Sequence, residues 1–417
     1  MPAAPSLLIV PYRSKTGKLY SQIPTSGAGD FTVTRNTEAR RFNSAGLIES
    51  VASGIPRLDY YTSGGTAGCP ALLVEPSAAN LKPRSDDWTN SAYTLTRVTQ
   101  NQSVNVAPLT KPMLEIRETA VTGTHSVQIQ PDATLVSGSI YTRSYFVSLA
   151  GRDVINFSDA GQGANSCRIN LSTKAVVSQE ANIISSRIVD YGNGLFLVSV
   201  TFTATSTIGR PSINLFEDNT TSSYLGDITK GVNIHFIQYE LGSVDTSYIP
   251  NANASGSVTR SADVISVSGA VSGSIGQTAG VVYAQVDLRN WTASGRVLAI
   301  SDGTSDARVV IQVGDNQTLQ AVVTAASGEV ANIATASGQV NGIYKCAVAY
   351  ASGDFAFYVN GNQIGTDSSG AVPACNNVAL GKIETSASTN FLNDRILAGA
   401  LYNTRLTNAE LATLTTL

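Results

Sequence analysis

Histidine is scarce in this chain: His125 and His235 are the only two among 417 residues. Charged residues make up 14% of the chain, against about 25% in an average soluble protein, and the formal net charge is -3. Because nucleic-acid binding depends on many Lys and Arg side chains, this balance excludes a basic nucleic-acid binder. Because hydrolytic and metal chemistry near neutral pH relies on histidine, we expect neither an enzyme nor catalytic residues.

Cysteine and long apolar runs are also limited. Four cysteines are scattered without a CxxC spacing, which excludes a zinc ribbon and a thioredoxin-type redox site; they are Cys69, Cys167, Cys346 and Cys375. A pairing of Cys346 with Cys375 and a set of four buried thiols both remain open. No run of 18 apolar residues occurs and no basic segment precedes the short apolar run at 7–10, so we expect no membrane insertion and no signal peptide.

Period-two alternation of apolar residues is the main structural signal. It appears partly at 140–149, more cleanly at 195–204, where Phe196, Val198, Val200 and Phe202 fall on one side, and again at 232–241. Runs of this kind, separated by Gly, Ser, Asn and Asp clusters, are typical of antiparallel strands. The sequence therefore predicts an all-β protein with two β-sandwich (jelly-roll) domains.

Composition divides the chain into four parts. Eight of the 14 prolines lie in residues 1–85, and because proline interrupts regular elements, we predict an extended, irregular N-terminal anchoring region there. Residues 86–250 carry enough strand signals for one sandwich of eight to ten strands. A polar linker is expected at 251–260, and a second sandwich at 261–417.

The last part of the chain has well-defined local signals. Strands are predicted at 344–350 and 355–359, and Asn360-Gly361 after the second one indicates a type I′ turn, whose central residues need a positive φ. Thr407 and Glu410 have the spacing of a capping box, which predicts a short helix over 409–414.

Two sets of segments resemble known families. FYVNGNQIGT (357–366), VALGKI (378–383) and LAGALYNTRLTNAEL (397–411) resemble the end of a concanavalin A-like (laminin-G-type) lectin domain. The segments 30–60, 69–81, 239–251 and 259–265, in this order, resemble fibre and appendage proteins of tailed bacteriophages, in which a jelly roll similar to carbohydrate-binding modules precedes a lectin-like domain.

The second resemblance implies a function. It implies a structural component of a bacteriophage virion, a head or tail fibre protein made in the host cytoplasm and exposed on the particle. It also implies a homo-oligomer, most often a homotrimer, that docks on other virion proteins through residues 1–85 and binds host surface glycans. Two alternatives remain open: a phage polysaccharide depolymerase, and a glycan-binding module that is not viral.

Candidate contacts between chains lie in the N-terminal region. Its charged residues offer ion pairs to neighbouring chains, and the candidates are Arg35, Arg40, Arg41, Arg57 and Asp59. The alternatives are that these side chains are solvated or that they pair within the chain.

Candidate glycan platforms are the two tryptophans. Sugar binding needs an aromatic face beside planar polar groups. Trp88 lies among polar residues and Trp291 next to a turn, so each is a candidate platform. The alternative is that each caps a sandwich core or lies at an interface.

Metal and catalytic motifs are weak. Asp302, Asp306 and Asp315 are candidate Ca²⁺ ligands without EF-hand spacing, and a solvated loop also explains them. Glu217-Asp218-Asn219 is explained by a plain turn. The E-x-D-x-x-E strand of catalytic lectin-like enzymes, a nucleophile elbow and a phosphate loop are all absent from the sequence.

Overall fold

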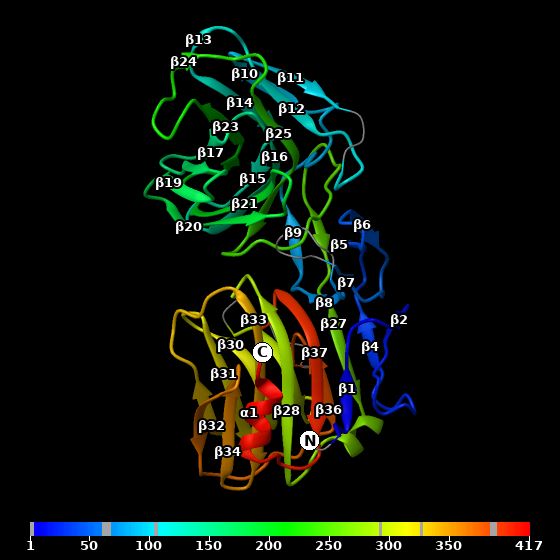
Figure 1. Ribbon diagram of the computed structural model, residues 1–417. Coiled ribbons are helices and arrows are strands. Elements are labelled where there is room, and N and C mark those ends of the chain that lie inside the picture. The colour runs from blue at the N-terminus through cyan, green and yellow to red at the C-terminus, as the bar shows by residue number, and fades with distance from the viewer. Residues whose placement is uncertain (1–3, 61–67, 104–106, 292–293, 326–327, 384–389) are drawn as a thin grey trace.

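The computed structural model describes residues 4–60, 68–103, 107–291, 294–325, 328–383 and 390–417. These residues form two β-sandwiches stacked end to end, with the N-terminal strands lying beside the lower sandwich in the view of Figure 1. The all-β prediction is confirmed. No helix in the described ranges is long and apolar enough to cross a membrane.

The middle sandwich has two six-stranded antiparallel sheets, more strands than the eight to ten expected. The first has the order β10 (Ala92–Thr96), β14 (His125–Gln130), β23 (Pro211–Phe216), β17 (Val154–Asp159), β18 (Cys167–Asn170), β19 (Ala175–Gln179). The second has the order β11 (Val98–Gln102), β12 (Leu114–Glu118), β25 (Gly231–Leu241), β16 (Ile140–Ala150), β21 (Leu195–Thr203), β20 (Ile183–Asp190). Two short pairs lie at its ends: β13 (Thr122–Gly123) with β24 (Tyr224–Leu225), and β15 (Ala133–Thr134) with β22 (Ile208–Gly209).

The second sandwich also has two sheets. The nine-stranded sheet runs β2 (Ser14–Lys15), β3 (Lys18–Leu19), β4 (Phe31–Thr34), β27 (Val264–Ser268), β36 (Asn377–Leu380), β29 (Arg296–Ser301), β30 (Arg308–Gly314), β31 (Thr318–Ala325), β32 (Gly328–Ala334). The eight-stranded sheet runs β35 (Asn362–Asp367), β34 (Asp354–Val359), β33 (Gly342–Ala351), β28 (Ala279–Leu288), β37 (Asp394–Tyr402), β8 (Ala71–Val74), β7 (Leu58–Asp59), and β1 (Leu7–Ile9) also pairs with β37. A short 3-10 helix, η1 (Ala270–Ser274), follows β27.

The N-terminal region differs from its prediction as an extended, irregular segment. Its short strands complete both sheets of the second sandwich: β4 pairs with β27, and β1 and β8 pair with β37. Leu7, Ile9 and Phe31 are fully buried in the core of that sandwich. Proline does interrupt the region, but between strands of two to four residues, and β1, β4 and β8 gain hydrogen bonds from partners far away in the sequence.

The chain crosses between the sandwiches twice. It leaves the second sandwich through β9 (Ala78–Asn80) and returns through β26 (Val258–Arg260), and these two strands pair with each other. The middle sandwich is thus inserted into the second one. A separate hairpin, β5 (Ala39–Phe42) and β6 (Ile48–Val51), lies beside this joint (Figure 1). In the predicted linker, Asn251 is fully buried and its side chain donates to the carbonyls of Asn80 and Gly256.

The local predictions for the last part of the chain are confirmed. The strands at 344–350 and 355–359 lie within β33 and β34, and Asn360 (φ 48°) and Gly361 (φ 83°) form the turn into β35. The helix α1 (Asn408–Thr415) begins with the complete capping box of Thr407 and Glu410.

Candidate functional site

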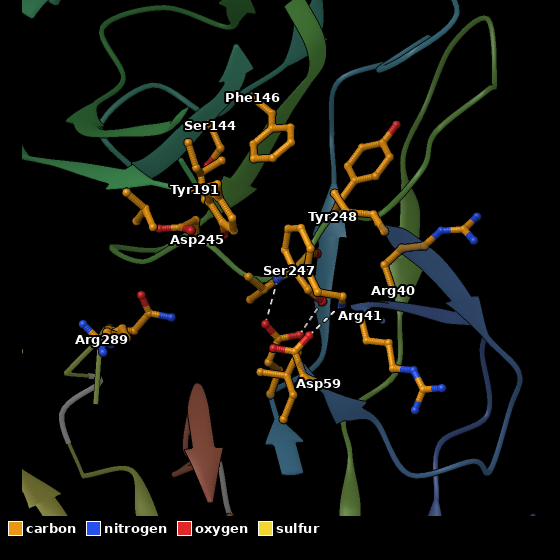
Figure 2. A pocket seen from close by; sticks show the side chains of 18 of the residues that line it. Arg40, Arg41, Asp59, Ser144, Phe146, Tyr191, Asp245, Ser247, Tyr248 and Arg289 are labelled. Carbon is orange, nitrogen blue, oxygen red and sulfur yellow. Dashed lines mark hydrogen bonds between the residues drawn. The ribbon is translucent and has the colours of Figure 1, made fainter. Parts of the chain in front are cut away.

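A cleft lies where the hairpin β5–β6, the middle sandwich and the second sandwich meet (Figure 2). Together with the solvent at its mouth it contains about 750 Å³ of space. Its walls come from the outer face of the sheet that contains β16 and β25, from the segment after β25, and from the ends of β7, β8, β28 and β37. Residues far apart in the sequence therefore meet in one recess, as is common for binding sites between domains.

Aromatic rings form a continuous row along one wall. Phe146 and Phe236 are cross-strand partners on β16 and β25, and their rings stack at 5.0 Å. Tyr248 stacks on Phe236 at 4.0 Å, and Tyr191 meets Phe146 edge-on at 5.3 Å. Phe42 from the hairpin stacks on Tyr191 at 5.0 Å. Phe146, Phe236 and Tyr248 are buried, whereas Phe42 and Tyr191 are partly exposed, so these last two offer aromatic surface to a ligand.

The acidic side chains of the cleft are all held by arginines. Asp59 accepts a 2.7 Å hydrogen bond from Nε of Arg395, and Asp245 pairs with Arg187. Glu75 is 2.7 Å from the guanidinium of Arg57, which lies behind the cleft wall. Each carboxylate therefore has a guanidinium partner within the chain.

A turn after β28 closes another side of the cleft. The backbone N–H groups of Arg289 and Asn290 each donate to the carboxyl group of Asp394 at 2.8 Å. Asp394 is buried, and burial raises the pKa of its carboxyl group to about 7. Asp394 thus positions the two cleft residues from beneath and does not itself line the recess.

A buried charge network lies directly behind the cleft. Asp263 pairs with Arg35 at 2.9 Å and with Arg57, and Glu75 pairs with Arg57 and, at 3.2 Å, with Arg260. Burial opposes the charge of Glu75, but the guanidinium groups of Arg57 and Arg260 outweigh that effect and lower its pKa to about 2. The network is fully buried.

The same network joins the four segments that carry the bacteriophage resemblance. Arg35 and Arg57 come from 30–60, Glu75 from 69–81, and Asp263 from 259–265. Ser247, from 239–251, donates its backbone N–H and its hydroxyl to Glu75. The four segments therefore meet at one joint between the two sandwiches.

The predicted contacts between chains are corrected for three residues. Arg35, Arg57 and Asp59 are at most 1% exposed and pair inside the chain. They are wrong as inter-chain contacts, because no partner chain can reach them in this fold. Arg40 and Arg41 are partly exposed, pair with Glu38 and Glu49 on the hairpin, and stay candidates.

The two tryptophans lie outside the cleft. Trp88 is 2% exposed and packs in the core of the middle sandwich, so its prediction as a surface platform is wrong. Its polar neighbours in the sequence form turns, while the indole turns inward. Trp291 is partly buried, meets Tyr344 edge-on, and donates from Nε1 to Asn341 at 2.9 Å. Its prediction as a platform remains open.

The remaining candidates lie in loops or cores. Asp302 accepts hydrogen bonds from Thr304, and within the part of the chain that the structure describes, no three His, Cys, Asp or Glu side chains are grouped as a metal would need. Asp218 accepts from Thr220 and Thr221, as expected for a plain turn. The cysteines Cys346 and Cys375 are buried free thiols. His235 is also buried, which lowers the pKa of its imidazole to about 4.

Sequence reasoning missed the aromatic row. Phe146 and Phe236 lie on the outward-facing side of strands whose inward side fills the sandwich core. A signal was present in 145–147 and 236–237, where apolar residues follow each other without alternation. Such a strand is buried on both faces, but the partner that covers the outer face cannot be read from the strand.

The comparisons with known proteins were of three kinds. No family model matches the chain, and no curated protein does. Among solved structures, the chain is similar to the CBM40 module of Ruminococcus gnavus IT-sialidase, with 15% identity and a TM-score of 0.30 over 33% of this chain and 83% of that one. Trypanosoma rangeli sialidase in complex with 2,3-difluorosialic acid has 12% identity and a TM-score of 0.31 over 98% of this chain and 83% of that one.

A heptameric SAP-like pentraxin from Limulus polyphemus is also similar, with 17% identity and a TM-score of 0.25 over 32% of this chain and 68% of that one. At these values the similarities carry no argument about a ligand or a reaction. The all-β architecture of this chain is established by its own strands and their pairing.

Proposed function

We propose that this chain is a structural component of a bacteriophage virion, a head or tail fibre or appendage protein, that binds a glycan in the cleft between its two sandwiches. The virion role, the homotrimer and the docking on other virion proteins rest on the sequence resemblance. The glycan-binding role rests on one observation, the row of aromatic rings beside guanidinium–carboxylate pairs in the same recess.

This recess has the chemistry that saccharide binding requires. A pyranose ring presents apolar C–H faces that pack on aromatic rings, which Phe42 and Tyr191 offer at the cleft. Its hydroxyls both donate and accept hydrogen bonds, so that a guanidinium N–H can donate to them. Arg187 and Arg395 keep part of their side chains exposed in the recess, and their partners Asp245 and Asp59 hold them in place from a buried position.

The charge state of the cleft favours binding over cleavage. A glycosidase of the usual kind needs one protonated carboxyl group as general acid beside a second carboxylate. Glu75 has a pKa lowered to about 2, whereas a general acid needs a raised one, and Asp59 and Asp245 are each paired with an arginine. This lining supports a binding role over the depolymerase alternative.

The test of the glycan role is binding to an array of oligosaccharides by the full-length chain and two variants. We expect Tyr191→Ala to weaken binding by roughly threefold to tenfold, since one aromatic packing contact contributes about 0.5–1.5 kcal/mol. Trp291→Ala is the matched control at the other candidate platform and should leave affinity unchanged. The opposite pattern would place the site at Trp291.

The virion role has its own test. Antibodies against this chain should label purified phage particles in electron micrographs, and the purified chain should have a mass about three times the 43.5 kDa of the monomer. Absence from particles would refute the virion role, and sustained release of reducing sugar from host capsule would refute the non-enzymatic one.

A further inference from the structure

Each charged side chain that lines the cleft forms an ion pair with a side chain of opposite charge. Its lining arginines each have a carboxylate partner: Arg40 with Glu38, Arg41 with Glu49, Arg187 with Asp245, Arg289 with Asp287 and Arg395 with Asp59. Its lining acids are likewise each paired with an arginine, as described above. Each of these lining charges thus has an oppositely charged partner within the chain.

Arg40 and Arg41, the two arginines of the hairpin, do not point into the aromatic part of the cleft. In Figure 2 the guanidinium ends of Arg40 and Arg41 point away from Tyr191 and Asp245. Arg187 and Arg395 both interact electrostatically with Tyr191 of the aromatic row, and their partners Asp245 and Asp59 are nearly fully buried.

Matched pairs of this kind select against a charged ligand. A ligand carboxylate that entered the cleft would lose its hydration and meet a guanidinium already neutralised by a protein carboxylate, so the two carboxylates would repel each other. A ligand hydroxyl carries no such penalty, because it is uncharged and accepts a hydrogen bond from a guanidinium N–H.

We infer that the ligand of this cleft is a neutral saccharide, without uronate, sialate, sulfate or phosphate groups at the residue that packs on Phe42 and Tyr191. The inference rests on the proposed glycan-binding function and specifies its ligand class. It predicts that affinity depends little on ionic strength, since no net charge attraction contributes.

The experiment compares matched probes on the full-length chain. One probe is an oligogalacturonate and the other is the same oligosaccharide after its carboxyl groups are reduced to hydroxymethyl groups; both are placed on an array with neutral and sialylated oligosaccharides. We expect binding only to neutral members, with an affinity that changes less than about twofold between about 50 and about 500 mM salt.

A variant reverses the selectivity. Asp245→Asn keeps the side-chain shape but leaves Arg187 with an uncompensated charge in the cleft, and it should gain binding to charged oligosaccharides that weakens with salt. Asp306→Asn removes an exposed carboxylate in the loop after β29 and is the matched control. If Asp245→Asn fails to fold, the matched probes and the salt series on the unmodified chain still test whether the ligand is neutral.

The outcomes separate the two proposals. Preferential, salt-sensitive binding of anionic oligosaccharides by the unmodified chain would overturn the neutral-ligand inference and leave glycan binding intact. Binding to no member of the array would overturn the glycan-binding function, and the inference with it.

Discussion

The two sandwiches are assembled in different ways. The middle one is built from the continuous stretch between β10 and β25, with its own core. The second one is built from both ends of the chain: strands before β9, among them β1, β4 and β8, supply core residues to sheets whose remaining strands lie from β27 onwards. The first 76 residues are therefore part of a folding unit that also needs residues beyond 258, and cannot be a free arm.

The largest expected effect comes from deleting residues 1–76. Leu7, Ile9, Leu19, Phe31, Val33, Leu58, Leu72 and Val74 are buried core residues in this segment. At roughly 1.5–3 kcal/mol per buried side chain, their loss amounts to roughly 12–24 kcal/mol, which is comparable to or larger than the roughly 5–15 kcal/mol of a typical domain. We expect the second sandwich to lose its cooperative thermal transition.

The control for this deletion is a fragment of residues 81–253, which contains the middle sandwich. It should keep a single cooperative transition measured by circular dichroism. A deletion variant in which both transitions persist would show that the two sandwiches do not differ in this way.

A smaller but still large effect is expected for Asp263→Ala, at the joint between the sandwiches. Asp263 pairs with both Arg35 and Arg57, and removing it leaves two buried guanidinium groups without this partner. Breaking a buried ion pair costs about 3–5 kcal/mol. Urea unfolding should report this loss, whereas Asp306→Ala, at an exposed loop, should change stability by less than about 0.5 kcal/mol.

Acid should weaken the same joint. The pKa of Glu75 is lowered to about 2 in the folded chain, from 4.5. Its contribution to stability is fully present above about pH 4.5 and is lost as pH falls towards about 2. Denaturation at pH 6 and pH 3 should show a difference that shrinks in Glu75→Gln; an undiminished difference would assign the acid sensitivity to other carboxyl groups.

The smallest effect is expected at α1, which packs on the second sandwich. Thr407→Ala removes the side-chain acceptor of the capping box, and such caps contribute about 1 kcal/mol. Differential scanning calorimetry should show a small decrease in the melting temperature. Thr404→Ala, at an exposed position before the helix, should have none.

Elements of this fold were predictable where the residues that define them lie close together in the sequence. The strands at 140–149, 195–204 and 232–241, the Asn360-Gly361 turn and the capping box were all recognisable, because their signals lie within a few residues. The strands of the first 85 residues were not. A strand of two to four residues between prolines shows no period, and its pairing partner lies up to about 390 residues away.

The candidate site shows the same dependence. Trp88 was selected because of its polar neighbours, yet the backbone turns its ring into a core. Phe42, Tyr191 and Tyr248 have no motif of their own; they meet only after β5, the end of β20 and the segment after β25 are brought together. Their common role cannot be read from any single segment.

Composition and periodicity alone determined that this is an all-β chain with little imidazole chemistry, because the side-chain repeat of a strand and the choice of residue types are local properties. Only the tertiary structure decided that the middle sandwich is an insertion, that Arg35 and Arg57 are buried at its joint, and that an aromatic cleft with balanced charges lies beside it. These features depend on contacts between segments that lie far apart along the chain, and such contacts produce no local sequence pattern in either segment.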